Sequence, residues 1–404
     1  MHQTYRSYMS ETNTSQSHSA TIPEGLIYEV TDFIRGLYGK QAHIPLHEPR
    51  FRGNEREYVL DAIDSTFVSS VGAYVDRFES MMREITGASH AVAVVNGTAA
   101  LHVALKLAGV EPGDLVLTQP LTFIATCNAI SYLGAEPYFV DVDRGRLGMS
   151  PNALESLLKQ DIVVRGGLAF HRASGRKVAA CVPMHTFGFP VEIDRIVEVC
   201  SSHGIKVVED AAESLGSLYK GRHTGTFGTL GTFSFNGNKT VTSGGGGIVV
   251  TDDEKLGKRA KHITTTAKIP HRWEYRHDET GFNYRCPNLN AALACAQLEQ
   301  LNSFIENKRQ TASMYRDFFG KLGLTMVTEQ PDSHANYWLN TLLLPGPDDR
   351  DLFLKMTNSS GIMTRPVWSL MHHLPMFQHC LRMPLDESEW VAARALNIPS
   401  SVRV

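Results

Sequence analysis

Between about residues 50 and 260 the chain alternates short apolar runs with amphipathic stretches. The apolar runs show no polar alternation, which predicts strands buried on both faces, as in a parallel sheet covered by helices. The stretches between them, such as TAALHVALKLAGV, have helical spacing and end near glycine. The pattern therefore predicts an α/β fold with a mostly parallel, doubly wound sheet. The predicted strands are AVAVV (91–95), DLVLTQ (114–119), PYFVDV (137–142), AACVPM (179–184), IKVVED (205–210) and GGIVV (246–250).

The rest of the pattern predicts how the chain is divided. Residues 1 to about 22 lack hydrophobic periodicity, so we expect a mobile leader and N-terminal arm over 1–42. A large domain is predicted over 43–300, with a polar hairpin (163–180) inserted before one of its strands. Residues 289–323 have the spacing of one or two long helices that lead into a smaller C-terminal α/β domain, 301–404.

Composition excludes several classes of protein. The 404 residues carry 39 basic and 42 acidic side chains, a net charge of −3, which gives no electrostatic reason to expect a nucleic-acid or membrane partner. No apolar run approaches the roughly 18 residues that span a bilayer, and the polar start has no signal-peptide core. The six cysteines form no C-x-x-C pair, so we expect buried free thiols, no metal site and a cytoplasmic location.

Candidate chemistry gathers where the predicted strands end, the edge at which open α/β sheets bind ligands. Gly97 and Thr98 follow one strand and begin a helix, where free N–H groups would favour a phosphate, although a simple helix cap has the same pattern. Phe123 follows the next strand, where it could be a residue of the hydrophobic core or a flat apolar surface against which a cofactor packs. Asp210 ends a buried strand, where a carboxylate either caps a helix or meets a cation.

Lys239 is the one Lys, Arg, Asp or Glu between Arg222 and Asp252. It is not a P-loop lysine, because that motif requires a preceding glycine. Pyridoxal phosphate (PLP) is the cofactor whose chemistry uses all of these features together. It needs a lysine for a Schiff base, an acid that keeps its ring nitrogen protonated, a phosphate site and apolar faces for the ring. The corresponding residues would be Lys239, Asp210, the phosphate ligands Gly97, Thr98 and Ser234, and the ring contacts Phe123 and Ala212.

Longer motifs carry a resemblance that runs from about residue 40 to the end of the chain. NGTAALHVALKLAGVEPGDLVLTQPLTFIATCNAI, VVEDAAESLGSLYKG, FSFNGNKTVTSGGGG and GFNYRCPNLNAALACAQLEQL resemble the DegT/DnrJ/EryC1/StrS family of PLP-dependent sugar aminotransferases. IPLHEPRFRGNEREYVLDAIDSTFVSSVGAYVDRFE, TTTAKIPHRWEYRHDETGFNYR and NIPSSVRV are most similar to its LegC group. The resemblance implies fold type I architecture and a homodimer with shared active sites. It also implies amination of a nucleotide-linked 4-keto-6-deoxy (N-acetyl)hexosamine by glutamate, for legionaminic-acid-type or related surface-glycan sugars.

Roles for single residues follow from the same resemblance. It places the Schiff-base lysine at Lys239, the partner of the pyridine nitrogen at Asp210 and a phosphate ligand at Ser234. Glu213 stands where the family commonly has a glutamine facing the cofactor's phenolic oxygen, which leaves the location of that proton open. Asn283 matches an asparagine that reaches the partner subunit's phosphate. Relatives with histidine at the lysine position deoxygenate their sugar, so the lysine argues against a dehydratase.

The sequence also contains candidate substrate contacts. His185 ends another strand at the same edge, as a substrate ligand or as a structural histidine. Lys268 and Arg272, in AKIPHRWEYRHD, could bind a diphosphate, or could belong to a solvated basic loop. Arg365 and His372, in TRPVWSLMHHLP, could close over the substrate.

Two alternative functions stay open. A different fold type I enzyme acting on amino acids would share Lys239 and Asp210 but should lack the FSFNGNK and NYRCPNLNAAL contexts. A non-catalytic PLP-binding sensor would need a fused regulatory domain, for which we find no spare segment. The sequence does not specify UDP or GDP as carrier, the acetamido pattern or the stereochemistry of the new amine.

Overall fold

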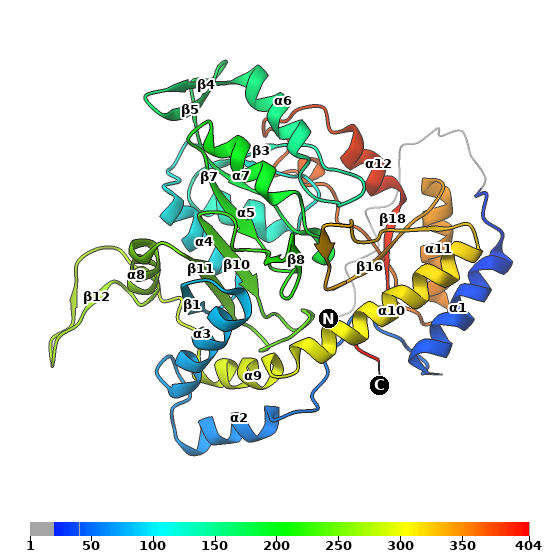
Figure 1. Cartoon of the computed structure of the whole chain (residues 1–404), viewed down its shortest axis with the longest axis horizontal. Coiled ribbons are helices and arrows are strands. Elements are labelled where there is room, and N and C mark those ends of the chain that lie inside the picture. The colour runs from blue at the N-terminus through cyan, green and yellow to red at the C-terminus, as the bar shows by residue number, and fades with distance from the viewer. Residues whose placement is uncertain (1–19, 40, 404) are drawn as a thin grey trace, which may run out of the picture.

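The computed structural model describes residues 20–39 and 41–403, so most of the predicted leader lies outside the described residues. A nine-stranded sheet forms the centre of the larger part of the chain (Figure 1). Seven strands lie in the order β1-β11-β10-β7-β6-β2-β3, and the β4–β5 hairpin extends the sheet from β6. Their bounds are β1 His90–Val94, β2 Leu115–Thr118, β3 Glu136–Phe139, β4 Ile162–Arg165, β5 Leu168–His171, β6 Lys177–Val182, β7 Lys206–Asp210, β10 Leu230–Ser234 and β11 Gly247–Thr251.

The mostly parallel sheet and the inserted hairpin are confirmed. Strands β10, β7, β6, β2 and β3 run parallel to one another, whereas β11 runs antiparallel to both β1 and β10, and β5 runs antiparallel to β6. The sequence pattern missed β10, because its run LGTFS is short and mixes glycine with hydroxyl side chains. Gly231 is required there, since a Cβ at this position would lie 1.9 Å from the carbonyl oxygen of Gly225. Strand β10 pairs Thr232 with Asp210 and so brings Ser234 to the same edge of the sheet.

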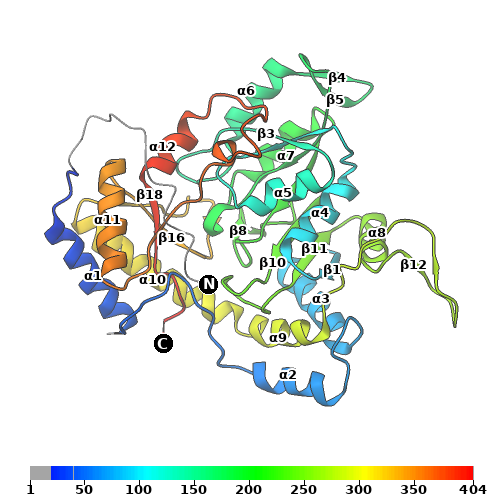
Figure 2. The ribbon, with the colours of Figure 1, turned by 180° about the vertical axis from the view of Figure 1, so that it is seen from behind.

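Helices cover both faces of the sheet, as Figures 1 and 2 show from opposite sides. Val92, Val116 and Val208 share one apolar core with the helices of one face, and Ala91, Leu117 and Val207 belong to cores on the other. Alternate residues of each strand thus enter different cores, which explains why the runs lack polar positions. The first face carries α4 Gly97–Ala108, α5 Ile124–Tyr132 and α8 Glu254–Thr264; the second carries α3 Ala73–Thr86, α6 Pro151–Asp161, α7 Ile193–Ser201 and α9 Asn288–Leu298, with α2 Glu55–Asp64 packed on α9.

The C-terminal region forms a second core around a four-stranded sheet ordered β14-β16-β18-β17. The predicted long helical segment is two helices, α9 and α10 (Leu301–Lys321), as expected. Helix α1 (Glu24–Tyr38), inside the predicted arm, buries Ile27 and Ile34 in the same core as Phe353 of α11. The remaining elements are β14 Thr325–Met326, β16 Asn340–Leu343, β17 Arg365–Pro366, β18 Ala395–Ile398, α11 Pro347–Ser359, α12 Asp386–Arg394 and the short 3₁₀ turns η1 Thr186–Gly188 and η2 Met371–His373.

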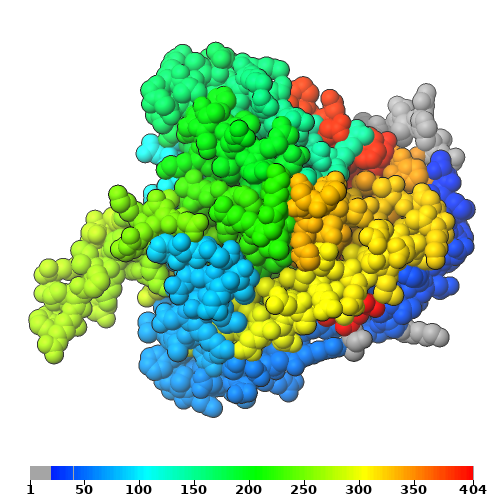
Figure 3. All heavy atoms as spheres, viewed as in Figure 1, coloured from blue at the N-terminus to red at the C-terminus, as the bar shows by residue number. Residues whose placement is uncertain are grey.

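Two small sheets lie outside these cores. β15 (Ser333–His334) joins β8 (Leu218–Tyr219) and β9 (Arg222–His223) in a three-stranded sheet that links the two regions. The predicted basic loop is a hairpin, β12 (Lys268–Ile269) and β13 (Arg276–His277), which projects from the body as an arm (Figures 1 and 3). All six cysteines are buried and free, as predicted. Within residues 20–39 and 41–403, no helix is both long and apolar enough to cross a membrane.

Candidate active site

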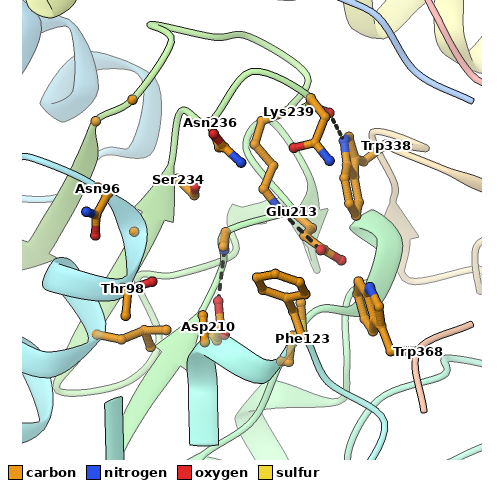
Figure 4. A pocket seen from close by; sticks show the side chains of 18 residues that line it. Asn96, Thr98, Phe123, Asp210, Glu213, Ser234, Asn236, Lys239, Trp338 and Trp368 are labelled. Atoms are coloured by element: carbon orange, nitrogen blue, oxygen red, sulfur yellow. Dashed lines mark hydrogen bonds and ion pairs between the residues drawn. The ribbon is translucent and has the colours of Figure 1, made fainter. Parts of the chain in front are cut away.

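A cavity of about 280 Å³ lies at the sheet edge where β7 and β10 end. Figure 4 shows Lys239 reaching into it toward Glu213, with Asn236 on one side and Trp338 on the other. The cavity brings together eight of the nine residues expected to contact the cofactor or react with it: Gly97, Thr98, Phe123, Asp210, Ala212, Glu213, Ser234 and Lys239. The ninth, Asn283, does not line it.

The start of helix α4 forms one end of the cavity. The side chain of Asn96 caps this helix by accepting a hydrogen bond from the backbone N–H of Ala99 at 2.8 Å. The backbone N–H groups of Gly97 and Thr98 belong to the first turn of the helix, where N–H groups have no carbonyl acceptor within the helix. Gly97 lies against Ser234, and a Cβ on Gly97 would come within 2.7 Å of the Ser234 Cβ. The sequence offered a helix cap and an anion site as alternatives. In the structure Asn96 caps the helix, and the same turn still presents other N–H groups that could bind an anion.

Asp210 supplies a buried carboxylate to the cavity. Its side chain is 2% exposed; one oxygen accepts a hydrogen bond from the Thr126 hydroxyl at 2.7 Å, and the other accepts from the N–H of Ala212 at 3.2 Å. Burial raises the pKa of Asp210 above its ordinary value, and the bonds from Thr126 and Ala212 oppose that rise. Thr126 lies on α5 and has no distinguishing sequence signal.

Lys239 lies between a carboxylate and an aromatic face. Its Nζ is 3.2 Å from Oε1 of Glu213 and 4.1 Å from the centroid of the Trp338 ring. The second carboxylate oxygen of Glu213 accepts a hydrogen bond from the N–H of Phe187 at 2.9 Å. Burial raises the pKa of Glu213 to about 7, although the charge of Lys239 acts in the opposite direction. Close to neutral pH, therefore, the carboxyl of Glu213 can hold or release a proton.

Aromatic side chains from both regions enclose the rest of the cavity. Trp368 packs against Phe187 at a centroid distance of 4.8 Å and against Phe123 at 5.9 Å. Trp338 and Trp368 follow α10 and α11 in the chain, so the cavity lies between the large sheet and the C-terminal region. The sequence reasoning missed both tryptophans.

The family model described as the DegT/DnrJ/EryC1/StrS aminotransferase family matches residues 49–404. The chain belongs to this family of aminotransferases. It is 38% identical to GDP-perosamine synthase from Escherichia coli O157:H7 over 359 residues, which cover 89% of this chain and 93% of that protein. It is 37% identical to the putative pyridoxal phosphate-dependent aminotransferase EpsN of Bacillus subtilis (strain 168) over 340 residues, 84% of each protein.

Among solved structures, the sugar aminotransferase CalS13 from Micromonospora echinospora has a TM-score of 0.78 to this DegT/DnrJ/EryC1/StrS chain. The two are 26% identical, and the match covers 88% of this chain and 94% of that chain. These findings confirm the predicted family and the fold type I architecture.

Enzymes of the DegT/DnrJ/EryC1/StrS family depend on PLP, and the residues of this cavity fit that group. The start of α4 and Ser234 offer donors to a phosphate, and Ser234 can lie this close to α4 because Gly97 has no side chain. Asp210 offers a buried anion to a protonated ring nitrogen, and Phe123 offers an apolar face. Lys239 supplies an amine within the same enclosed space.

His185 lies outside the cavity and is fully buried. Its Nε2 is 3.0 Å from a carboxylate oxygen of Glu209, and its Nδ1 accepts from the N–H of Val191 at 3.3 Å. Both ring nitrogens are therefore occupied within the protein. This geometry disagrees with the predicted substrate contact and fits the structural alternative.

The predicted diphosphate ligands lie in a separate groove. Lys268 in β12 and Arg272 in the turn between β12 and β13 line it with Arg285. Asn283 is exposed and accepts from Arg285 Nε at 3.2 Å. Trp273 and Tyr275 on the arm are 70% and 83% exposed. None of these residues lines the Lys239 cavity of their own chain.

Arg365 and His372 flank Trp368 in sequence but do not line the cavity. Arg365 is exposed and donates to the side-chain oxygen of Asn358 at 2.8 Å. His372 is buried, with its Nε2 2.8 Å from a carboxylate oxygen of Glu389, and burial lowers its pKa. In this arrangement Trp368, rather than either predicted residue, brings the C-terminal segment to the site.

Proposed function

We propose that this chain transfers the amino group of glutamate to the keto carbon of a nucleotide-linked 4-keto-6-deoxy hexose, with PLP as cofactor. One observation carries the proposal: the amine of Lys239, the buried carboxylate of Asp210 and the first turn of α4 line one cavity in an aminotransferase fold. An amine, an acid and an anion site in one enclosure are the three polar requirements of PLP catalysis.

Each residue then has a defined task. Lys239 would hold the cofactor covalently and, when released, would serve as the base that takes a proton from the amino donor and as the acid that gives it back. PLP, when bound, withdraws electrons from the carbon that loses this proton. Asp210 would keep the ring nitrogen protonated. Gly97, Thr98 and Ser234 would bind the phosphate, and Phe123 and Ala212 would contact the ring. Glu213 holds or releases a proton next to Lys239.

We also propose a homodimer with shared sites. Asn283, Lys268 and Arg272 lie away from their own chain's cavity, so they can reach a cofactor or substrate only if a second copy docks there. Helix α2 and the segment after it expose Leu60 and Phe67, each more than half exposed, which are suitable for burial against another subunit. Full activity in a demonstrably monomeric preparation would contradict this arrangement.

Two observations bear on the nucleotide carrier and the sugar of the substrate. The relative named GDP-perosamine synthase supports a GDP carrier. The resemblance to the LegC group supports an N-acetylhexosamine and a legionaminic-acid-type product. A GDP-linked hexose without the acetamido group is therefore the second candidate, and it is favoured by the relative's name. The arm, with Lys268, Arg272 and two exposed aromatics, suits a diphosphate joined to a flat base in either case.

The decisive test offers glutamate-treated protein a panel of 4-keto-6-deoxy sugars: GDP-hexose, and GDP- and UDP-linked N-acetylhexosamine. We expect one of them to yield a 4-amino sugar by NMR, with stoichiometric 2-oxoglutarate. If simple 2-oxo acids accept the amino group and no sugar nucleotide does, an amino-acid transaminase replaces this proposal. Borohydride should fix PLP to the peptide that contains Lys239, and labelling of another lysine would contradict its assignment.

A further inference from the structure

The amine of Lys239 lies in a site that this chain has built for it. On one side is the Glu213 carboxylate, with Oε1 at 3.2 Å, and on the other is the face of the Trp338 ring at 4.1 Å. Both partners are buried, Trp338 being 4% exposed. A carboxylate and an indole face are two of the best ligands for an ammonium group in a site with little water.

Trp338 is held in this position by three hydrogen bonds. Its indole N–H donates to the carbonyl of Asn238, the residue before Lys239, at 2.7 Å. Its backbone N–H donates to Oδ1 of Asn336 at 2.8 Å, and its carbonyl accepts from the buried ammonium of Lys308 at 3.2 Å. Rotation of the ring away from Lys239 would break the first of these bonds. The indole is therefore fixed to the backbone that carries the lysine.

Asn336 joins the two sides of the site. Its side-chain N–H groups donate to the carbonyls of Glu213 and Leu215, both at 2.9 Å, while its oxygen accepts from Trp338. Asn336 is fully buried. A Cβ at Gly188 would lie 1.9 Å from Asn336 Oδ1, so the amide fits there because residue 188 is a glycine. One side chain thus fixes the backbone of both residues that contact the amine.

We propose that Glu213 and Trp338 form a resting site for the amine of Lys239 whenever that amine is free, and that Asn336 is the positioning residue that holds the site together. The inference rests on the proposed function, in which Lys239 is attached to the cofactor and released in each cycle. The site keeps the released amine inside the cavity and oriented, so that it does not drift into solvent. Trp368, which lines the same cavity, packs on Phe187 and Phe123 and has no part in it.

The test uses cofactor-free protein and measures how fast acetic anhydride modifies Lys239, above the pKa of Glu213. Mass spectrometry compares the Lys239 peptide with that of exposed Lys255, an internal standard. Loss of either ligand destabilises the protected ammonium, so Trp338→Leu and Glu213→Gln should each raise the relative rate about threefold or more. Trp338→Phe, which keeps an aromatic face, should fall between wild type and Trp338→Leu. Asn336→Asp should raise the rate although it touches no atom of Lys239.

Trp368→Leu is the matched control, because it removes an indole from the same cavity, and it should label at the wild-type rate. Wild-type rates in the Glu213 and Trp338 variants, or an equal rise in Trp368→Leu, would overturn the resting site. If Trp338→Leu does not fold, Trp338→Phe and Glu213→Gln decide the question. Because the labelling involves no cofactor, its failure is distinguishable from failure of the borohydride and sugar-nucleotide tests of the proposed function.

Discussion

Replacing Glu213 with glutamine tests the electrostatics of the active site directly. The carboxyl is buried, with one oxygen bonded to the N–H of Phe187 and the other 3.2 Å from Lys239. A glutamine has the same shape and still has an oxygen that can accept from Phe187, but it cannot ionise. The variant therefore removes the ionisation of residue 213 and changes the packing of the site little.

The expected magnitude follows from the pKa of Glu213, which burial raises to about 7 in the folded protein against an ordinary 4.5. A carboxyl with a raised folded pKa contributes stability that is fully present below pH 4.5 and is lost as the pH rises through 7. The complete loss corresponds to about 3 kcal/mol. The wild type should therefore lose about 2 kcal/mol relative to Glu213→Gln from about pH 5 to about pH 8.

Urea denaturation of the cofactor-free proteins over this pH range measures the difference. Glu57→Gln, which neutralises an exposed carboxylate on α2, is the control and should differ from the wild type by an amount that hardly changes with pH. A difference between Glu213→Gln and wild type that stays flat from acid to alkaline pH would refute the reasoning. Glu213 would then be charged throughout and permanently paired with Lys239.

Three further predictions concern other parts of the molecule. Asp210→Asn should fold normally by circular dichroism but lose about 100-fold in kcat, because an amide cannot stabilise a protonated ring nitrogen; near-normal turnover would leave the carboxylate as a helix cap only. Arg272→Ala should raise KM for the sugar nucleotide about tenfold or more while sparing the glutamate half-reaction, and equal effects on both would contradict a diphosphate contact. Burial lowers the pKa of Lys308 to about 7 from 10.5, so wild-type stability should rise with pH between these values, and Lys308→Met should abolish that rise in pH-dependent urea denaturation.

The sequence was sufficient to predict the part of the site that lies on the sheet. Parallel strands end at one edge, so residues that directly follow buried runs, such as Thr98 and Asp210, had to lie close together. Lys239 was recognisable because a single cation in a long uncharged segment indicates either an ion pair or a functional role. Strand β10 escaped detection, since Gly231 and the hydroxyl residues around it resemble a loop, yet it is β10 that brings Ser234 to Asp210.

The part of the site contributed by the C-terminal region was not predictable in this way. Trp338 and Trp368 belong to segments that look like ordinary core, and no periodicity relates them to Lys239, which precedes them by 99 and 129 residues. Their position depends on how the second core docks against the sheet, which is determined by buried polar contacts such as those of Asn336. The sequence offers one weak signal: in ANYWLN, Asn336 precedes two aromatic residues, which suggests that it is buried. A buried asparagine is costly unless its hydrogen bonds are satisfied.

The two neighbouring carboxylates at the end of β7 differ in how fully the protein satisfies them with hydrogen bonds. Glu209 and Asp210 are both buried, but successive strand residues face opposite ways, so they meet different surroundings. Glu209 has the N–H groups of Gly225, Phe227 and Gly228 within 2.7 Å as well as the His185 ring at 3.0 Å, and these donors fill the roughly four acceptor sites of a carboxylate. In the described residues Asp210 has only two donors, the Thr126 hydroxyl and the Ala212 N–H, and its unused acceptor capacity faces the cavity. A buried anion left half-satisfied is costly for a protein without a ligand, and a protonated pyridine nitrogen is a donor that would satisfy it.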